Sequence, residues 1–359
     1  MPKALIFTDL HIHAHKQKTD RLQDCLKVLD WCFEQAIVQE CQYVLFLGDL
    51  FHERSKIDVL NYLRTFEIFS KYENHPIETY LLVGNHDMYH REHWDVNSIK
   101  PLSAFKNVHI VEKPSTLPIG NISIDFLPYT ERPIEALKEL KEGRKKKDLR
   151  LLLGHLAVHG AVLNMLYGTT ADVVVEYDTG MAIVDPAIFD DWDMTLLGHY
   201  HGAQKLNKTV EYLGSPLQLS FGEAFQDKHI LVLDLDTLEK TYITNDFSPK
   251  HYVLGVDDLP NYDLENSFLR VVVNDIAAKE LVDIKLDLIK NKKVASFDFK
   301  QKEKKTEDFE VIEEARAILF KSDEMLAKWL DSLQNNIGLD KTKLLEIGKQ
   351  ITEQVMEDV

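Results

Sequence analysis

The chain has 359 residues, of which 45% are hydrophobic and 28% are charged, a balance typical of a soluble globular protein. Its apolar runs are shorter than the roughly 18 residues that a membrane-spanning helix needs, and its three cysteines are too few for a disulfide framework. The formal net charge of -17 argues against strong binding of nucleic acid by this chain alone, because phosphate contacts normally require lysine and arginine.

The first half of the sequence alternates between strand and helix patterns. Apolar stretches predict buried strands at 4–8, 43–47 and 79–83, and apolar residues at helical spacing predict helices at 20–40 and 57–72. This alternation indicates an α/β class with a mostly parallel sheet. Shorter strands are predicted later, at 108–111, 122–126, 149–153, 194–197 and 230–235. The segment 135–147 is predicted to be a charged, solvent-exposed helix or loop.

The pattern changes after about residue 250, and we expect four regions: 1–250, 251–298, 299–310 and 311–359. A strand at 268–273 and a helix at 277–290 indicate a small second domain. The mixed-charge run 299–310 suits an exposed linker. Two amphipathic helices are predicted beyond it, and they have little core of their own. They therefore dock either on a partner or on the main domain.

Five short polar clusters follow predicted strands. They are Asp9-Leu10-His11, Gly48-Asp49-Leu50-Phe51-His52, Gly84-Asn85-His86-Asp87, Gly154-His155-Leu156 and Gly198-His199-Tyr200-His201. In open α/β sheets, ligands bind outside the carboxyl ends of the strands, where these clusters lie. Carboxylate, imidazole and amide groups together suit divalent manganese, iron or zinc. A single such cluster is more often structural, but five in this arrangement predict a metal site.

The clusters, in this order, resemble the motifs of the calcineurin-like metallophosphoesterases. Gly48-Asp49-Leu50-Phe51-His52 and Tyr212-Leu213-Gly214-Ser215-Pro216 are similar to stretches of the SbcD nuclease family. The resemblance covers about residues 1 to 235. It implies a sandwich of two β-sheets flanked by helices, with a small α/β cap domain and C-terminal helices.

The resemblance also implies a pair of divalent metal ions. Manganese is expected, and magnesium, iron and zinc remain open. One ion would be held by Asp9, His11 and His201 and the other by Asn85, His155 and His199, with Asp49 bridging both. Two ions at this spacing clamp the attacking and leaving oxygens of a displacement at phosphorus.

Three further residues are expected to act on the substrate. His86 would stabilise charge or protonate the leaving oxygen, and Asp87 would hold His86 in the right tautomer. The resemblance to the SbcD nucleases implies that His52 helps to place the DNA strand end, unless it is simply a buried, hydrogen-bonded histidine. His13 and His15 depart from the family pattern and are expected to be solvent-exposed bystanders.

The function implied is a DNA nuclease subunit, with 3′→5′ exonuclease and single-strand endonuclease activity in DNA repair and recombination. The expected partner is an SbcC-type coiled-coil ABC ATPase, with the nuclease as a homodimer inside a heterotetramer. The C-terminal segment would bind the coiled coil through Leu326, Trp329, Leu330, Leu333, Leu344 and Leu345. We expect a cytoplasmic location without membrane attachment, in a bacterium or a phage-infected host.

Two alternatives stay open at this stage. A stand-alone metallophosphodiesterase or phosphatase, acting on small nucleotides or phosphoproteins, would use the same ligands. A phosphoprotein phosphatase more often shows Gly-Asn-His-Glu than the Gly-Asn-His-Asp of residues 84–87. A non-catalytic scaffold is the other alternative, and it is disfavoured because all seven expected ligands are present.

Overall fold

A computed structural model of the chain describes residues 2–13, 19–90, 92–142, 149–163, 173–174, 183–274 and 276–301. The compact unit Met1–Gln301 contains all of them. The six residues expected to bind a partner, Leu326 to Leu345, lie outside the described residues. So do His15 and nearly all of the expected linker, of which only 299–301 are described.

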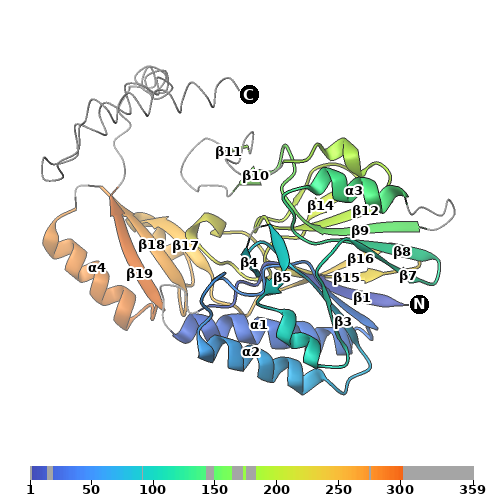
Figure 1. The fold of residues 1–359 in the computed structure, drawn as a ribbon. Coiled ribbons are helices and arrows are strands. Elements are labelled where there is room, and N and C mark those ends of the chain that lie inside the picture. Colours follow the sequence, from blue (N-terminus) through green and yellow to red (C-terminus); the bar gives the residue numbers. More distant parts are fainter. Residues whose placement is uncertain are drawn as a thin grey trace, which may run out of the picture. The chain divides into compact units, whose positions relative to one another are not determined.

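Two six-stranded sheets form the main part of the fold (Figure 1). The first has the order β16-β15-β1-β2-β3-β6, and its strands are Lys240–Thr244, His229–Asp234, Lys3–Phe7, Tyr43–Phe46, Glu78–Leu82 and Val108–Val111. The second has the order β13-β14-β12-β9-β8-β7, and its strands are Gln204–Lys205, Val210–Tyr212, Met194–Gly198, Leu149–His155, Ile122–Leu127 and Ser115–Ile119. Strands β1, β2, β3 and β6 pair in parallel, which confirms the predicted parallel sheet.

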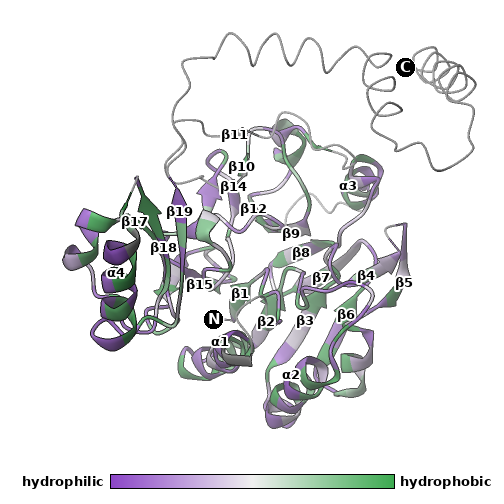
Figure 2. Ribbon diagram, turned by 90° about the vertical axis from the view of Figure 1, so that its left-hand side faces the viewer, coloured by the Kyte–Doolittle hydropathy of each residue, from purple (hydrophilic) through white to green (hydrophobic). Residues whose placement is uncertain are grey.

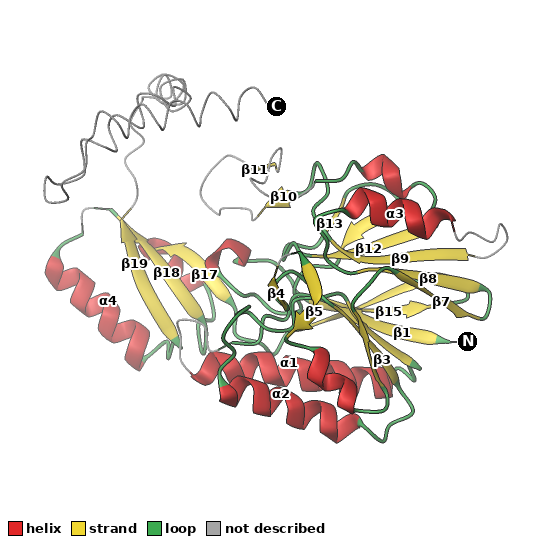
Figure 3. Cartoon of the chain, viewed as in Figure 1, coloured by secondary structure: helices red, strands yellow, loops and turns green. Residues whose placement is uncertain are grey.

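Helices cover the outer faces of both sheets. The helices α1 (Thr19–Val38) and α2 (Val59–Tyr72) lie side by side along the first sheet, and α3 (Pro133–Glu142) lies on the second (Figure 3). Short 3-10 turns occur at Lys100–Ala104, Pro186–Phe189, Phe221–Glu223 and Val256–Asn261. Two small hairpins, β4 (Met88–His90) with β5 (His93–Asn97) and β10 (Val162–Leu163) with β11 (Val173–Val174), complete this part.

Alternating side chains explain the layers. In β1, Ala4 and Ile6 belong to a buried cluster with residues of the second sheet, whereas Leu5 and Phe7 pack with residues of α1 and α2. Successive side chains of a strand point to opposite faces, so a continuous apolar run is what a strand covered on both sides requires. The sequence of β1 therefore encodes a central strand of a sandwich.

The segment 135–147 differs from its predicted form. Instead of a solvated helix or loop, α3 buries Ala136, Leu137 and Leu140 in the cluster beneath the second sheet. Apolar residues at spacings of one, three and four place these side chains on one helix face, and the numerous charged residues of the segment obscure this pattern. Residues 143–148 lie outside the described ranges.

A smaller sheet follows the sandwich. Strands β17 (His251–Gly255), β18 (Phe268–Val273) and β19 (Ser296–Gln301) pair in parallel, and α4 (Ala278–Lys290) connects β18 to β19. Both hydrophobic and hydrophilic residues occur along α4 (Figure 2). The apolar ones include the fully buried Leu288, which packs with Leu269 and Val271 of β18. The smaller sheet and α4 thus share a hydrophobic cluster that is distinct from those of the two larger sheets.

Within the described part of the chain, none of the helices is both long enough and apolar enough to cross a lipid bilayer.

Candidate metal centre

The polar clusters meet where the two sheets end. Asp9 follows β1, Asp49 follows β2, Asn85 follows β3, His155 ends β9 and His199 follows β12. Backbone hydrogen bonds tie the first two loops together: the amide of Asp9 donates to Gly48 O at 2.9 Å and that of His11 to Asp49 O at 3.0 Å. Because parallel strands end at one edge of a sheet, the fold brings distant parts of the sequence to one place.

The first group of side chains consists of Asp9, His11 and His201. The Nε2 atoms of His11 and His201 lie 3.0 Å apart, and His11 Nε2 is 3.9 Å from Asp9 Oδ1. Donor atoms of these three residues all lie within 4.8 Å of one another. This is the set that the family resemblance assigns to one ion.

The second group consists of Asn85, His155 and His199. Asn85 Oδ1 lies 3.0 Å from His155 Nε2 and 3.0 Å from His199 Nδ1. Asp49 lies between the two groups: its Oδ2 is 3.6 Å from His11 Nε2 and 3.4 Å from His155 Nε2. All seven residues that the resemblance implies as ligands are therefore gathered at one site, with Asp49 between the two groups.

The hydrogen bond at Nδ1 of His155 turns the other ring nitrogen, Nε2, toward the acceptor oxygens of the site. His155 Nδ1 lies 2.7 Å from Leu47 O, and since a carbonyl oxygen only accepts, Nδ1 carries the proton. Nε2 of His155 faces the acceptor oxygens Asn85 Oδ1 at 3.0 Å and Asp49 Oδ2 at 3.4 Å, so a positive charge is needed between the ring and these oxygens. Without a metal ion, a second proton on the ring meets that need, in line with the raised pKa of His155. A divalent ion in place of that proton would bind Nε2 together with the oxygens, so the donor set fits divalent metal ions.

The site is buried, and its charges act strongly on one another. Burial by itself would raise the pKa of Asp49, but His155, His11 and His86 together hold it well below its usual range. Burial would lower the pKa of His155, yet Asp49 and Asp9 raise it to about 9. Burial and the neighbouring His155 lower the pKa of His199 to about 3. Such opposed shifts mark a site where charges of both signs are concentrated in a dry environment.

Backbone strain is also concentrated here. Asp9, His11, Asp49 and His199 have φ of 52°, 47°, 63° and 99°, in the left-handed region that disfavours residues with a Cβ. Each such residue costs about 1–3 kcal/mol and persists only where the surroundings hold it. Strain at four of the seven expected ligands indicates that the fold is built around this site.

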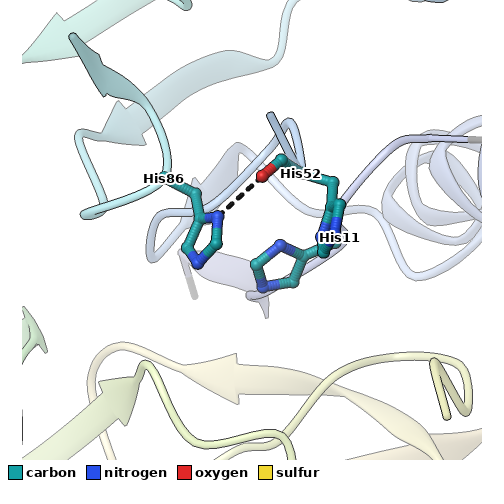
Figure 4. Close-up of side chains that lie close together, drawn as sticks. All are labelled: His11, His52 and His86. Carbon is teal, nitrogen blue, oxygen red and sulfur yellow. Dashed lines mark hydrogen bonds between the residues drawn. The ribbon is translucent and has the colours of Figure 1, made fainter. Parts of the chain in front are cut away.

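His86 lies beside the first group, and Figure 4 shows its ring with those of His11 and His52. Its Nδ1 is 2.7 Å from the carbonyl oxygen of His52, which only accepts, so Nδ1 donates. The ring centroids of His86 and His11 are 4.7 Å apart. His52 is half-buried and contributes its backbone to this contact. The proton on Nδ1 leaves Nε2 of His86 as the atom for proton exchange with a substrate.

The expected hydrogen bond from His86 to Asp87 is wrong. The fully buried carboxylate of Asp87 accepts from the amides of Gly84 and Asp49 at 2.9 Å and from Leu50 at 3.0 Å. Burial and the charge of Asp49 raise the pKa of Asp87 to about 7. Asp87 therefore joins the loop after β3 to the loop after β2, and the His52 carbonyl takes the tautomer-fixing role. Although Asp87 is next to His86 in the sequence, its carboxylate binds backbone amides of Gly84, Asp49 and Leu50 and not the His86 ring.

Glu223 and Lys228 are two charged residues of this site that the sequence did not single out. Glu223 Oε1 lies 3.2 Å from His201 Nδ1, and Glu223 Oε2 accepts from Lys228 Nζ at 2.7 Å. Their signal in the sequence is weak, because Glu223 and Lys228 lie in a stretch, 215–228, that also contains other polar and charged residues. The expected bystander His13 is partly exposed and lies 3.9 Å from the Glu53 carboxylate.

Comparison with known proteins adds independent information. Residues 2–203 match the model of the family described as calcineurin-like phosphoesterase. The chain belongs to this family. The calcineurin-like phosphoesterase match spans β1 to the loop after β12 and so includes every expected ligand.

Three relatives are similar to parts of the chain. A protein of Invertebrate iridescent virus 3 named 078R, classed as a phosphoesterase, is 27% identical over 52% of this chain and 50% of its own length. Exonuclease subunit 1 of Enterobacteria phage T4 is 22% identical over 70% of this chain and 69% of its own. An SbcCD nuclease subunit of Staphylococcus epidermidis is 30% identical over 32% of this chain and 30% of its own. The chain thus spans about half of the length of the first relative.

Proposed function

We propose that this calcineurin-like phosphoesterase is a metal-dependent phosphodiesterase that cuts DNA as the nuclease subunit of an SbcCD-type complex. One observation carries the proposal: the carboxylate of Asp49 lies between two complete ligand groups, 3.6 Å from His11 Nε2 and 3.4 Å from His155 Nε2. A shared carboxylate is a simple way to hold two ions at the spacing that a displacement at phosphorus needs.

The seven ligands would hold two divalent ions, with Asp49 contacting both. When bound, such ions neutralise the charge of a phosphodiester and lower the pKa of water, which supplies the nucleophile. His86 acts from the chain itself: its Nδ1 is fixed by the His52 carbonyl, and the protonated ring donates from Nε2 to the leaving oxygen. Asp87 contributes by fixing the loops that carry Asp49 and Asn85.

The DNA substrate and the partner have separate support. Two relatives are named as nuclease or exonuclease subunits, and such a name implies an assembly. The net charge of -17 gives this chain little attraction for a polyphosphate, so a partner would have to supply positive surface. The ATPase partner, the 3′→5′ direction, the single-strand endonuclease activity, the manganese preference and the homodimer within a heterotetramer belong to this proposal.

The charge also favours a second candidate. A chain with a net charge of -17 suits a small phosphodiester better than a long polyanion. A stand-alone phosphodiesterase acting on small nucleotides therefore stays the alternative.

Hydrolysis of bis-p-nitrophenyl phosphate with Mn²⁺ tests the part of the proposal in which Asp49 contacts both metal ions. Asp49→Asn should lower the rate at least about 100-fold, because even the outer partners of metal ligands are worth 10–100-fold. Asp125→Asn is the matched control, since Asp125 is a fully buried, hydrogen-bonded carboxylate of β8 outside the ligand set. Equal rates for Asp49→Asn and the unaltered chain would disprove the role of Asp49.

A further inference from the structure

Beside the first ligand group lies a buried ion pair that the proposed mechanism does not use. Glu223 is fully buried, and Lys228 is 5% exposed. Glu223 Oε2 accepts from Lys228 Nζ at 2.7 Å, from Ser215 Oγ at 2.9 Å and from the amide of Leu219 at 3.2 Å. With Oε2 so engaged, Oε1 faces the ring of His201 at 3.2 Å from Nδ1.

The contact with Glu223 fixes the ring of His201. A carboxylate only accepts, so Nδ1 of His201 carries the proton and Nε2 keeps its lone pair. That Nε2 is the atom 3.0 Å from His11 Nε2, inside the first ligand group. A ligand histidine whose other nitrogen donates to a carboxylate is held in one tautomer and one orientation, and it becomes a stronger donor.

The backbone of His201 is held from the same side. Lys228 Nζ donates to His201 O at 2.7 Å, and the amide of Ser215 donates to that oxygen at 3.1 Å. Gly214 makes this close approach possible, because a Cβ there would lie 2.7 Å from His201 O. Residues of the segment 214–228 therefore form hydrogen bonds with both the ring and the main-chain carbonyl of His201.

Fold stability alone explains this arrangement poorly. Removing a lysine and a carboxylate from water carries a large desolvation penalty, and a buried pair often stabilises a fold no more than apolar residues of the same volume would. Of the hydrogen bonds that the pair makes, those to the ring and the carbonyl of His201 are directed at an expected ligand. Both hydrogen bonds to His201 help to fix the position of its Nε2 atom.

We propose that Glu223 is a positioning residue for His201 and sets the affinity of the ion held by Asp9, His11 and His201. Lys228 balances the charge of Glu223 and keeps its carboxylate turned to the ring, away from the ion. This inference rests on the two-ion site of the proposed function, and it assigns a role to residues outside the ligand set.

Calorimetric titration of the full chain with Mn²⁺ tests the inference. Glu223→Gln keeps the side-chain volume and removes the charge, and it should weaken one of two binding steps by about 10–100-fold while leaving the other unchanged. Asp125→Asn serves as the control, because this fully buried carboxylate is paired with Arg150 and contacts no expected ligand. It should destabilise the fold and leave both Mn²⁺ steps unaltered.

A second variant covers the case in which Lys228, left without its partner, prevents folding. Glu223→Gln combined with Lys228→Met removes both charges, and it should fold and show the same selective loss of one step. If this variant or the single one folds and binds both ions as the unaltered chain does, the positioning role is wrong. A loss of affinity equal to that of Asp125→Asn would be a general effect of stability and would also overturn it.

The tautomer can be checked without any substitution. In the unaltered chain loaded with Zn²⁺, ring ¹⁵N resonances should show His201 protonated at Nδ1; an unprotonated Nδ1 would contradict the proposal. Mn²⁺ titration of the unaltered chain also distinguishes failure of the metal centre from failure of the role of Glu223. If it bound no divalent ion, the metal centre itself would be wrong. If it bound two and Glu223→Gln matched it, only the role of Glu223 would fall.

Discussion

Asp49 shows at the scale of a single residue how the site is constrained. Its φ is 63°, its side chain is buried, and its Oδ1 accepts the amide of His86 at 2.7 Å while its Oδ2 faces His11 and His155. The loop from β3 packs so tightly against it that a Cβ on Gly84 would overlap the Asp49 carboxylate and amide. The glycine that opens the Gly84-Asn85-His86-Asp87 cluster is required by this contact.

Replacement of Gly84 should therefore act on the metal site. Gly84→Ala pushes Asp49 out of place, and we expect Mn²⁺ affinity to fall at least about 10-fold, as for loss of a ligand's supporting contact. Gly120→Ala is the control: it lies in the hairpin between β7 and β8, with no atoms within 4 Å of its would-be Cβ. Its φ of 59° costs some stability but should leave Mn²⁺ titration unchanged. Normal Mn²⁺ binding by Gly84→Ala would contradict the tight contact.

His86→Gln should separate proton transfer from metal binding. The rate should fall about 10²–10⁴-fold, because a general acid is lost, while Mn²⁺ affinity stays unchanged. The loss should be larger for a diester with an alkyl leaving group than for p-nitrophenolate, which needs no proton to leave. The exposed His93→Gln should have no effect on either. Equal losses for both leaving groups would exclude His86 as the acid.

The sequence predicted that the five polar clusters meet, because each follows a buried strand and parallel strands end together. The choice of seven ligands within these clusters came from the resemblance to the calcineurin-like family. It could not predict which way Asp87 turns, since neighbours in sequence share a loop but not an orientation. Glu223 and Lys228 were missed because their role depends on a fold contact with His201, 22 residues from Glu223 along the chain.

At the scale of elements, β1 and β2 could be predicted because each is a continuous apolar run, and α1 because its apolar residues keep helical spacing over its length. The helix α3 was misread because its apolar face is narrow and its charges are many. The hairpin β4–β5 was missed, since its strands Met88–His90 and His93–Asn97 are short and polar. Continuous apolar strands and long amphipathic helices can therefore be predicted from the sequence, whereas short strands with polar residues, which depend on tertiary pairing, cannot.

The packing of α1 offers a test at this scale. Arg21 of α1 is fully buried. Its guanidinium donates a hydrogen bond to Gln218 O and forms an ion pair with Asp24 at 3.3 Å. The guanidinium carbon also lies 5.3 Å from the ring centroid of Phe268 in β18. Arg21 thus joins α1 to the segment that carries Glu223 and to the smaller sheet. Arg21→Met should lower the free energy of unfolding by about 3 kcal/mol, because Asp24 and Gln218 O lose their buried donor.

Arg64→Met on α2 is the matched control for urea denaturation. Arg64 is 50% exposed and pairs with Glu67 three residues on, so its loss should cost less than about 0.5 kcal/mol. Similar unfolding free energies for the two variants would mean that Arg21 does not hold these elements together.

At the scale of the whole molecule, the expected ligands and their supports all lie before residue 229, inside the unit Met1–Gln301. The residues expected to bind a partner all lie after residue 310. Hydrolysis and partner binding are therefore expected to depend on different parts of the chain, and a truncation should be able to remove one without the other.

A chain ending at Gln301 should hydrolyse bis-p-nitrophenyl phosphate within about twofold of the full chain, because each residue of the metal centre is retained. It should lose binding to an SbcC-type coiled coil, measured by co-purification with the full chain as the reference. Unchanged co-purification would show that the C-terminal segment is not the docking element.

Degradation of end-labelled duplex and single-stranded DNA by the purified chain tests the central claim most directly. It is run with Mn²⁺, with Mg²⁺ and with a chelator, beside Asp49→Asn and with or without an added SbcC-type ATPase. The account predicts Mn²⁺-dependent shortening from 3′ ends that chelator and Asp49→Asn abolish. DNA that stays intact in every condition, including with the added ATPase, while bis-p-nitrophenyl phosphate is turned over, would contradict the nuclease assignment and leave a small-substrate phosphodiesterase.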